Sequence, residues 1–499
     1  MSLGADILGV TEETFSLIKA TTNGILQSTG LYGVDLQPLV SLVPVDTPFR
    51  NSTPRMPAPQ GAQYAYWRSL QNVNNQQLNP AVPFDYAGPI AIIDERDVFA
   101  PFSPLAQGGS VTWDALAQSM GYADALAVDT LQTLNQLMIG DDINQLNAIS
   151  FPLPSIATPS GTTSATGGSI ASGASVNIQV AARSGNNFYY GGSGPASANF
   201  AIPAGTTTST NSVTATVAAV ECAVAYDWYV GSTSSNQVYY TTTTVNTVTI
   251  TMVPTAAQPV PTSSYPLLSS VQPSTPPTAD TSYNTYWMNG LLGSILGDFS
   301  NSAGATNLTT PGSGTSQGAY FKSLDGGQFH VSGASVAELD ALNQAIYDKW
   351  QLSPTRYLMG SQSVNDLTNA FLNSPQAVAF LQPSGADGRN ALAMGGSVSR
   401  YFNKTVNGKP ISIELQPHLA PGTVIAVTDE IPFPGANIDV PLSVETQLDY
   451  ARFDYGANRQ LNTSGGGPRY DFEIRSVQAF RNKAAATMGV ISNIAPGVV

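Results

Sequence analysis

Residues 398–434 read VSRYFNKTVNGKPISIELQPHLAPGTVIAVTDEIPFP, and this stretch says most about the fold. The segment KTVNGKPISIEL predicts a β-hairpin, because Asn407–Gly408 suits the two central positions of a type I′ turn. A further strand is expected after the hairpin, where the sequence becomes TVIAV. The connection between them contains the pattern P-x-L-x-P-G, formed by Pro417, Leu419, Pro421 and Gly422.

Around this stretch, residues 283–499 have a mixed α and β pattern. Ser335 and Glu338 form a capping box that predicts a helix running to Trp350. After Pro354, which stops that helix, TRYLMG predicts a buried strand. Three more elements are expected, a helix at Val364–Leu372 and strands at Tyr470–Ile474 and Ala486–Ile494.

Residues 151–282 differ sharply from the rest of the chain. From Phe151 to Ala279 the only charged residues are Arg183, Glu221 and Asp227, and Pro/Ser/Thr-rich linkers lie at both ends. Short alternating strands between the linkers predict an inserted β-sandwich. We expect Tyr226 and Trp228 in its core, where Trp228 resembles the core tryptophan of immunoglobulin-like modules without their cysteine pair.

A long amphipathic helix is expected from Trp113 to Ile139, about 40 Å at 1.5 Å per residue. Before it, residues 56–104 predict an extended hairpin, with strands at Gln63–Leu70 and Ile90–Phe99. Residues 1–55 are expected to be an arm with a short helix near Glu12–Ala20. A lone hairpin is marginally stable and needs another surface. Its candidate subunit-interface residues are Tyr64, Tyr66, Trp67, Arg68, Phe84, Tyr86, Asp94, Glu95, Arg96 and Asp97.

Composition excludes several classes of protein. Charged residues make up 10% of the 499 residues and hydrophobic residues 42%, which predicts a folded chain with much surface meant for other protein. The formal charge of −14 does not supply the basic surface that duplex DNA requires. Cys222 is the only cysteine, so no intrachain disulfide forms. Neither a secretory signal nor a membrane-spanning stretch is expected.

Motifs that suggest chemistry have simpler explanations. Gly140-Asp141-Asp142 is expected to end the long helix, since glycine is favoured there, rather than to hold Mg²⁺. Residues 312–318 form a glycine loop without the Lys-Ser/Thr of a phosphate cradle. His418 and Asp429 lack a nucleophile elbow, and His330 has no companion ligand. We therefore expect no enzyme activity, no cofactor and no metal site.

The order of these parts resembles the Hong Kong 97-type fold of tailed-phage major capsid proteins. The fold class expected is α+β with an all-β immunoglobulin-like insertion. The resemblance rests on residues 398–434, on YDFEIRSVQAFRNKAAATMGVISNI at 470–494 and on the element order. It implies an N-terminal arm (1–55), an E-loop hairpin (56–104), a spine helix and start of the P-domain (105–150), the insert (151–282), P-domain (283–384), A-domain (385–445) and a return to the P-domain (446–499).

The resemblance further implies hexamers and pentamers in an icosahedral head that encloses double-stranded DNA without sequence-specific binding. It implies assembly in the host bacterial cytoplasm with a separate scaffolding protein, a portal and possibly a decoration protein. Some relatives join E-loops through a Lys–Asn bond, but no lysine lies between Lys19 and Lys322, so non-covalent locking is expected. The insert is open to three roles: decoration, a weak glycan-binding surface, or a strap between neighbours.

Three other functions stay open. An encapsulin-like compartment shell would share the core fold, and a phage tail protein could carry a similar module. A secreted glycan-binding β-protein would explain the Ser/Thr-rich middle, although the missing signal peptide opposes it. Size-exclusion chromatography and microscopy would separate shells or capsomers from a monomer.

Overall fold

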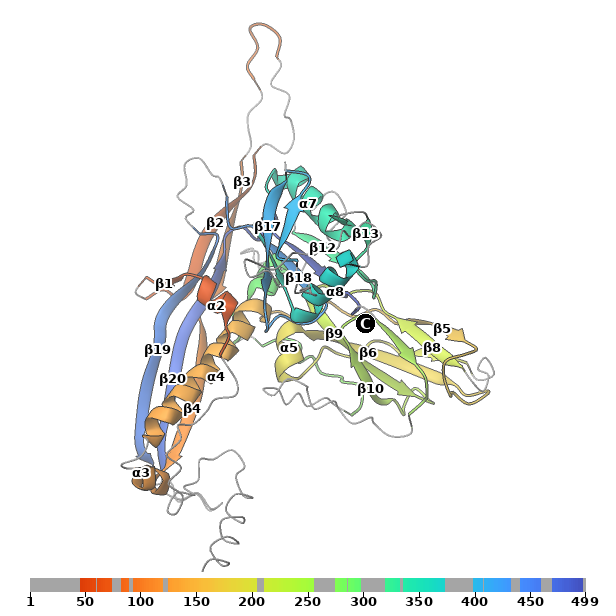
Figure 1. Ribbon diagram of the computed structural model, residues 1–499, viewed down its shortest axis with the longest axis horizontal. Coiled ribbons are helices and arrows are strands. Elements are labelled where there is room, and N and C mark those ends of the chain that lie inside the picture. Colours follow the sequence, from red (N-terminus) through yellow and green to blue (C-terminus); the bar gives the residue numbers. More distant parts are fainter. Residues whose placement is uncertain are drawn as a thin grey trace, which may run out of the picture. The chain divides into compact units, whose positions relative to one another are not determined.

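A computed structural model shows a mixed α and β fold (Figure 1). The structure describes residues 45–59, 61–73, 82–88, 93–119, 124–203, 211–254, 274–284, 286–297, 319–332, 335–372, 398–406, 408–431, 440–458 and 469–496. The helix expected at Glu12–Ala20 and the glycine loop at 312–318 lie outside these residues. The chain divides into two compact units, the first with Pro104–Asp141 and Thr446–Gln478, the second with Thr47–Ser103, Asp142–Glu445 and Ala479–Val499.

The first unit packs helix α4 (Ala125–Asn147) on long antiparallel strands. These are β19 (Leu442–Asn458), β20 (Arg469–Asn482) and β4 (Ser103–Thr112), which are neighbours in that order in one sheet. Strand β1 (Arg55–Pro57) belongs to the second unit. Leu137 of α4 is buried with Phe472 and Ile474 of β20, and Leu126 and Leu134 pack against this cluster. The apolar stripe of the helix therefore forms the core of this unit, as its 3.6-residue period predicts.

The expected helix at Trp113–Ile139 is only partly correct. The structure has a short helix α3 (Trp113–Ser119) and then α4, with residues 120–123 outside the described part. Asp124 begins α4, because its carboxylate accepts the backbone N–H groups of Leu126 and Ala127 at 3.0 and 3.2 Å. The expected end at Gly140 is wrong, since α4 continues to Asn147. Tertiary packing outweighs the low helix propensity of glycine there.

The second unit contains a six-stranded mixed sheet with the order β12-β21-β18-β15-β17-β16. These strands are β12 (Tyr320–Ser323), β21 (Gly489–Ser492), β18 (Val424–Val427), β15 (Arg356–Met359), β17 (Lys409–Leu415) and β16 (Arg400–Asn403). Central β15 is parallel to β17 and antiparallel to β18. Helices α7 (Ala337–Trp350) and α8 (Ser361–Leu372) share a core with this sheet, to which they contribute Leu339, Leu342, Ile346 and Leu367.

The predicted hairpin within residues 398–434 is present as β16 and β17, paired from Arg400↔Ser412 to Asn403↔Lys409. The N–H of Lys409 donates to the carbonyl of Val406 at 2.9 Å, and Gly408 has a φ of 73°, which glycine adopts without strain. Asn407, whose conformation would fix the turn type, lies outside the described residues. The strand predicted at TVIAV is β18.

The predicted capping box is wrong. Ser335 lies in strand β14 (Ser335–Val336), which pairs with β13 (Val331–Ser332), and α7 begins at Ala337 after Val336. The Glu338 carboxylate accepts the backbone N–H of His330 at 3.1 Å instead of capping its own helix. Strand pairing of Ser335 and the contact of Glu338 with His330 therefore replace the predicted cap.

Within residues 151–282, the strands form two antiparallel sheets with the orders β10-β9-β6-β7 and β11-β8-β5. Phe200 lies over Gly161, where an added Cβ would be 2.9 Å from the phenyl ring, so the two sheets pack face to face there. The elements are β5 (Ser160–Ser164), β6 (Val176–Ser184), α5 (Gly185–Tyr190), β7 (Phe200–Ile202), β8 (Ser212–Thr216), β9 (Ala223–Gly231), β10 (Val238–Thr243) and β11 (Thr247–Ile250).

The remaining elements belong to the second unit. Strands β2 (Tyr64–Val73) and β3 (Ile93–Pro101) form a separate two-stranded ribbon, in place of the strands expected at Gln63–Leu70 and Ile90–Phe99. The short helical pieces are α2 (Pro48–Ser52), α6 (Leu291–Leu296) and the 3₁₀ turn η1 (Ala485–Thr487). Among the described residues, no helix has the length and hydropathy needed to cross a membrane.

Candidate assembly surface

The ribbon of β2 and β3 presents three aromatic side chains on one face. Tyr66 is paired with Phe99, so their side chains point to the same side, and Tyr64 follows the same alternation. The ring centroids are 5.4 Å apart for Tyr64–Phe99, 6.0 Å for Tyr64–Tyr66 and 6.2 Å for Tyr66–Phe99. Tyr66 is 63% exposed and Tyr64 38% exposed. We call Tyr64, Tyr66 and Phe99 the aromatic face.

The opposite face of the ribbon is attached to its own unit. Ala65 and Ala100 are paired across the strands and are buried together with Ala479. Trp67 and Phe102 pack against this small cluster. The ribbon is therefore held through Ala65, Ala100 and Trp67, while the side chains of the aromatic face point away from this attachment.

Phe84 and Tyr86 are highly exposed, with 99% and 72% of their surface accessible. They belong to a turn in which the N–H of Tyr86 donates to the carbonyl of Pro83 at 3.2 Å. Asp85 at the centre of the turn has a φ of 69°, a left-handed conformation that aspartate tolerates better than most residues. Nothing in the described part of the chain covers the Phe84 ring.

The charged candidates lie on the ribbon, but their side chains are outside the described part of the structure. The backbone register pairs Arg68 with Asp97, Ser69 with Arg96 and Leu70 with Glu95. A bulge between Leu70 and Asn72 then brings Asn72 opposite Asp94. The register therefore places Arg68 and Asp97 at directly opposite positions of the two strands.

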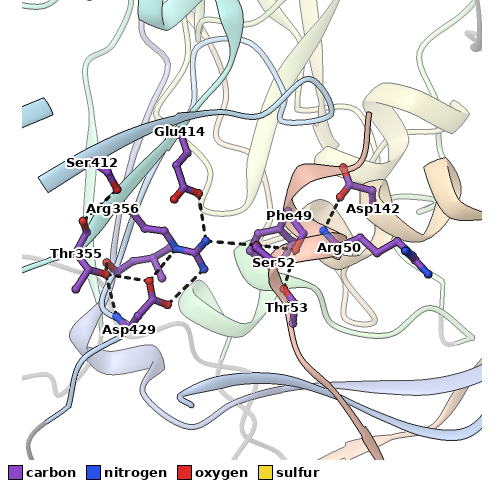
Figure 2. A network of polar contacts seen from close by, with 11 residues as sticks. Phe49, Arg50, Ser52, Thr53, Asp142, Thr355, Arg356, Ser412, Glu414 and Asp429 are labelled. Atoms are coloured by element: carbon purple, nitrogen blue, oxygen red, sulfur yellow. Dashed lines mark hydrogen bonds and ion pairs between the residues drawn. The ribbon is translucent and has the colours of Figure 1, made fainter. Parts of the chain in front are cut away.

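Arg356 connects four elements in the second unit (Figure 2). Its guanidinium forms a bidentate ion pair with Asp429, with Nε–Oδ2 2.9 Å and Nη2–Oδ1 3.3 Å. Nη1 donates to Glu414 of β17 at 3.1 Å and makes a longer contact of 3.4 Å with the Ser52 hydroxyl of α2. The Arg356 side chain is 11% exposed, so this pairing is shielded better than a surface salt bridge.

Asp142 provides a second attachment for α2. It is fully buried, and its Oδ1 accepts the backbone N–H of Arg50 at 2.8 Å (Figure 2). Its Oδ2 lies 2.7 Å from Nδ1 of His418, in the connection between β17 and β18. The backbone carbonyl of His418 also accepts the amide N–H of Asn147 at 2.8 Å. The P-x-L-x-P-G connection is thereby tied to α4 through its histidine.

These contacts separate the residues that the sequence suggested as a catalytic pair. His418 binds Asp142 and Asp429 binds Arg356, so neither is oriented toward a serine nucleophile. No group of three or more His, Cys, Asp or Glu side chains suited to a metal occurs in the described ranges. Sequence reasoning assigned Asp142 only to the end of the long helix and missed its buried partners, and it did not single out Arg356. Asp142 could have been found, because it follows Met138 by four residues on the apolar stripe of the helix.

In the insert, Tyr226 and Trp228 are fully buried. Nε1 of Trp228 donates to the Thr243 hydroxyl at 2.8 Å, and the Tyr226 hydroxyl accepts the N–H of Val220 at 3.1 Å. Asp227, between them in sequence, points to the other side of β9 and forms an ion pair with Arg183 at 3.3 Å. Burial raises the pKa of the Asp227 carboxyl in spite of the lowering effect of Arg183.

No family model matches the chain, and no curated protein matches it. Among solved structures, the capsid of a native GTA particle is similar at 8% identity and a TM-score of 0.42, over 95% of this chain and 100% of that one. The capsid of cyanophage A-1(L) is similar at 9% identity and a TM-score of 0.42, over 92% and 95%. The SrpI encapsulin complex of Synechococcus elongatus is similar at 9% identity and a TM-score of 0.35, over 92% and 93%.

Proposed function

We propose that the chain is the major capsid protein of a tailed bacteriophage, whose copies form the hexamers and pentamers of an icosahedral head. The observation that carries this proposal is the aromatic face of the β2–β3 ribbon. Tyr64, Tyr66 and Phe99 contact one another, and Tyr64 and Tyr66 remain exposed, while Ala65 and Ala100 on the other side attach the ribbon to its own unit. The role is structural and involves no catalysis.

A two-stranded ribbon has little stability of its own, and aromatic side chains are concentrated in the centres of protein interfaces. Covering the aromatic face would remove apolar surface from water, at roughly 25 cal/mol per Å². A second copy of the chain is the partner that a shell supplies at every position, and closed symmetry multiplies modest contacts. The aromatic face is thus suited to contact a neighbouring subunit.

The sequence resemblance supports the assignment of the parts. In this proposal residues 1–55 are the arm, 56–104 the E-loop and 105–150 the spine and start of the P-domain. Residues 283–384 and 446–499 form the P-domain, and 385–445 form the A-domain. Residues 151–282 are an immunoglobulin-like insertion. The hydrogen bond from the Val220 N–H to the Tyr226 hydroxyl supports the last assignment, because immunoglobulin folds often contain such a tyrosine corner.

The charge of the chain fits a container. A net charge of −14 does not supply the basic surface whose lysines and arginines would release counterions from DNA phosphates. The enclosed genome is therefore packaged without sequence-specific binding. A scaffolding protein, a portal and a decoration protein are the expected partners, and the assembled protein is located in the virion after assembly in the bacterial cytoplasm. Because no lysine lies between Lys19 and Lys322, the ribbon is locked without a lysine-derived bond.

Sedimentation velocity and negative-stain microscopy of the full chain test this function. We expect capsomers or closed shells from the wild type, and loss of these species from the double variant Tyr66→Ser and Phe99→Ser with unchanged secondary structure by circular dichroism. Tyr190→Ser is the matched control, since Tyr190 is exposed in the insert instead of the ribbon. A wild-type chain that sediments only as a monomer would favour the glycan-binding alternative and refute the proposal.

A further inference from the structure

Helix α5 of the insert is attached to the C-terminal end of α4 by buried polar side chains. The Asn186 amide donates to Asn144 Oδ1 at 2.7 Å, and both side chains are buried. Gly185 lies against Asn147, because a Cβ added to Gly185 would be 2.6 Å from the Asn147 Cβ. Glycine permits this close approach of the two helices since it has no side chain. We call Asn144, Asn147, Gly185 and Asn186 the first attachment.

The turn between β10 and β11 of the insert makes a second attachment, to the turn at residues 324–327. Asn246 Nδ2 donates to Asp325 Oδ1 at 2.8 Å. Thr247 packs against Gly326, where an added Cβ would be 2.8 Å from the Thr247 hydroxyl. Asp325 and Gly326 have φ values of 48° and 81°, so a tight left-handed turn positions the carboxylate. We call Asn246, Thr247, Asp325 and Gly326 the second attachment.

Contacts outside the insert join the two attachments to each other. The side chain of Asn147 also donates to the His418 carbonyl at 2.8 Å, in the P-x-L-x-P-G connection. In the same connection, the Gly422 carbonyl accepts the N–H of Ile494 at 3.2 Å. The carbonyl of the residue before Ile494 accepts the N–H of Gly326 at 3.0 Å. A continuous path of contacts therefore leads from the end of α4 to the second attachment.

Within the insert, one sheet joins the same two attachments. Strand β6 leads directly into α5 and is paired with β9 from Asn177 to Ser184. Strand β9 is paired in turn with β10, and the turn after β10 contains Asn246. Val217 holds Asn246, because its carbonyl accepts the Asn246 side-chain amide at 2.7 Å and its N–H donates to the Asn246 carbonyl at 3.0 Å. The insert thus closes the path of contacts into a ring.

From this ring we infer that the insert is an internal brace, which fixes the end of α4 to the turn at residues 324–327. A module joined to its domain only by linkers would move and unfold by itself. In a closed ring, one attachment cannot open widely while the other holds, so the insert and the six-stranded sheet should open together. The inference concerns the second unit of a single chain and does not depend on the shell that we propose.

Native-state hydrogen exchange of the full-length wild-type protein, measured by mass spectrometry at increasing urea concentrations, tests the brace. The elements to compare are β9, inside the insert, and β18, in the six-stranded sheet. We expect both to exchange through one common opening with the same dependence on urea, because elements that form one cooperative unit open together. Separate openings for β9 and β18 would overturn the inference.

Gly185→Ala tests the first attachment, because the added methyl group would overlap the Asn147 side chain. We expect exchange to become about tenfold faster or more in β9 and in β18 alike. Gly194→Ala is the matched control within the insert, since its Cβ would be 3.5 Å from the nearest atom, the Ala182 carbonyl oxygen. The control should exchange as the wild type does. Unchanged exchange in Gly185→Ala, or faster exchange confined to the insert, would overturn the inference.

Asp325→Gly tests the second attachment from outside the insert. Glycine keeps the left-handed turn and removes the carboxylate that Asn246 contacts. We expect exchange in β9 to become about threefold faster or more, although the substitution lies in another part of the second unit. Exchange in β9 equal to that of the wild type would show that the insert does not depend on this contact and would contradict the brace.

Discussion

At Asp142 one carboxylate receives a backbone N–H from α2 and an imidazole nitrogen from the β17–β18 connection. Replacing Asp142 by alanine removes the buried carboxylate that both groups contact. We expect a loss of about 3 kcal/mol in the free energy of unfolding. Chemical denaturation of the full chain measures it. Asp114→Ala is the control, since Asp114 is exposed in α3, and its loss should be about 1 kcal/mol or less.

Glu221 gives the insert a dependence on pH. Burial raises the pKa of its carboxyl from 4.5 to about 7. Between these values the unfolded chain releases a proton that the folded chain retains, so stability falls as pH rises from about 4.5 to about 7 and is constant above. Glu221→Gln should remove this decline, as seen in melting temperatures from pH 4 to pH 8. An equal decline in both proteins would show that another group causes it.

The sequence predicts residue burial better than residue partnership. Strand alternation and the resemblance of Trp228 to the core tryptophan of immunoglobulin-like modules predict Tyr226 and Trp228 in the insert core, and both are fully buried. Arg356 and Asp429 are 73 positions apart, and their pairing depends on how β15 and β18 meet in the sheet. His418 was considered together with Asp429, yet it contacts Asp142 from a helix 276 positions away. Such pairs follow from the fold and have no local sequence signal.

Among the elements, β4 approaches β20 closely at Gly109. A Cβ added there would lie 2.3 Å from the Phe472 ring and 2.8 Å from the Thr133 hydroxyl. We expect Gly109→Ala to destabilise the first unit by about 1–3 kcal/mol, because the aromatic ring must move out of its core. Gly108→Ala is the adjacent control, whose nearest contact would be 3.8 Å from the Phe472 carbonyl. Hydrogen exchange of β20 distinguishes the two variants. Equal exchange in both would contradict this packing.

Element identity was predicted well, and element ends were predicted poorly. The buried strand at TRYLMG and the hairpin after Arg400 are present as β15, β16 and β17. The long helix extends past Gly140 because Asp141 and Asp142 find buried partners, Asp141 with Tyr450 and Gln478. The capping box at Ser335 fails because β14 pairs with β13. In both cases a contact distant in sequence outweighs a local propensity.

At the scale of the whole molecule, association of subunits depends on the aromatic face of the ribbon, which the chain itself leaves accessible. The attached side has Ala65, Ala100 and Ala479 at its centre. On the aromatic face, aromatic pairs contribute roughly 0.5–1.5 kcal/mol beyond their buried area. A subunit with such a face is expected to be soluble mainly as part of an oligomer. Removal of the aromatic face should reduce the association of subunits without reducing the free energy of unfolding of the single subunit.

The most direct measurement places a photo-reactive benzoylphenylalanine at position 66 in the full chain. Copies carrying ¹⁴N and ¹⁵N are mixed before assembly, and the cross-linked peptides are identified by mass spectrometry. The account predicts cross-links that join a labelled copy to an unlabelled one, in the fraction that sediments as capsomers or shells. Cross-links confined to a single copy, from a ribbon folded back on its own subunit, would contradict it.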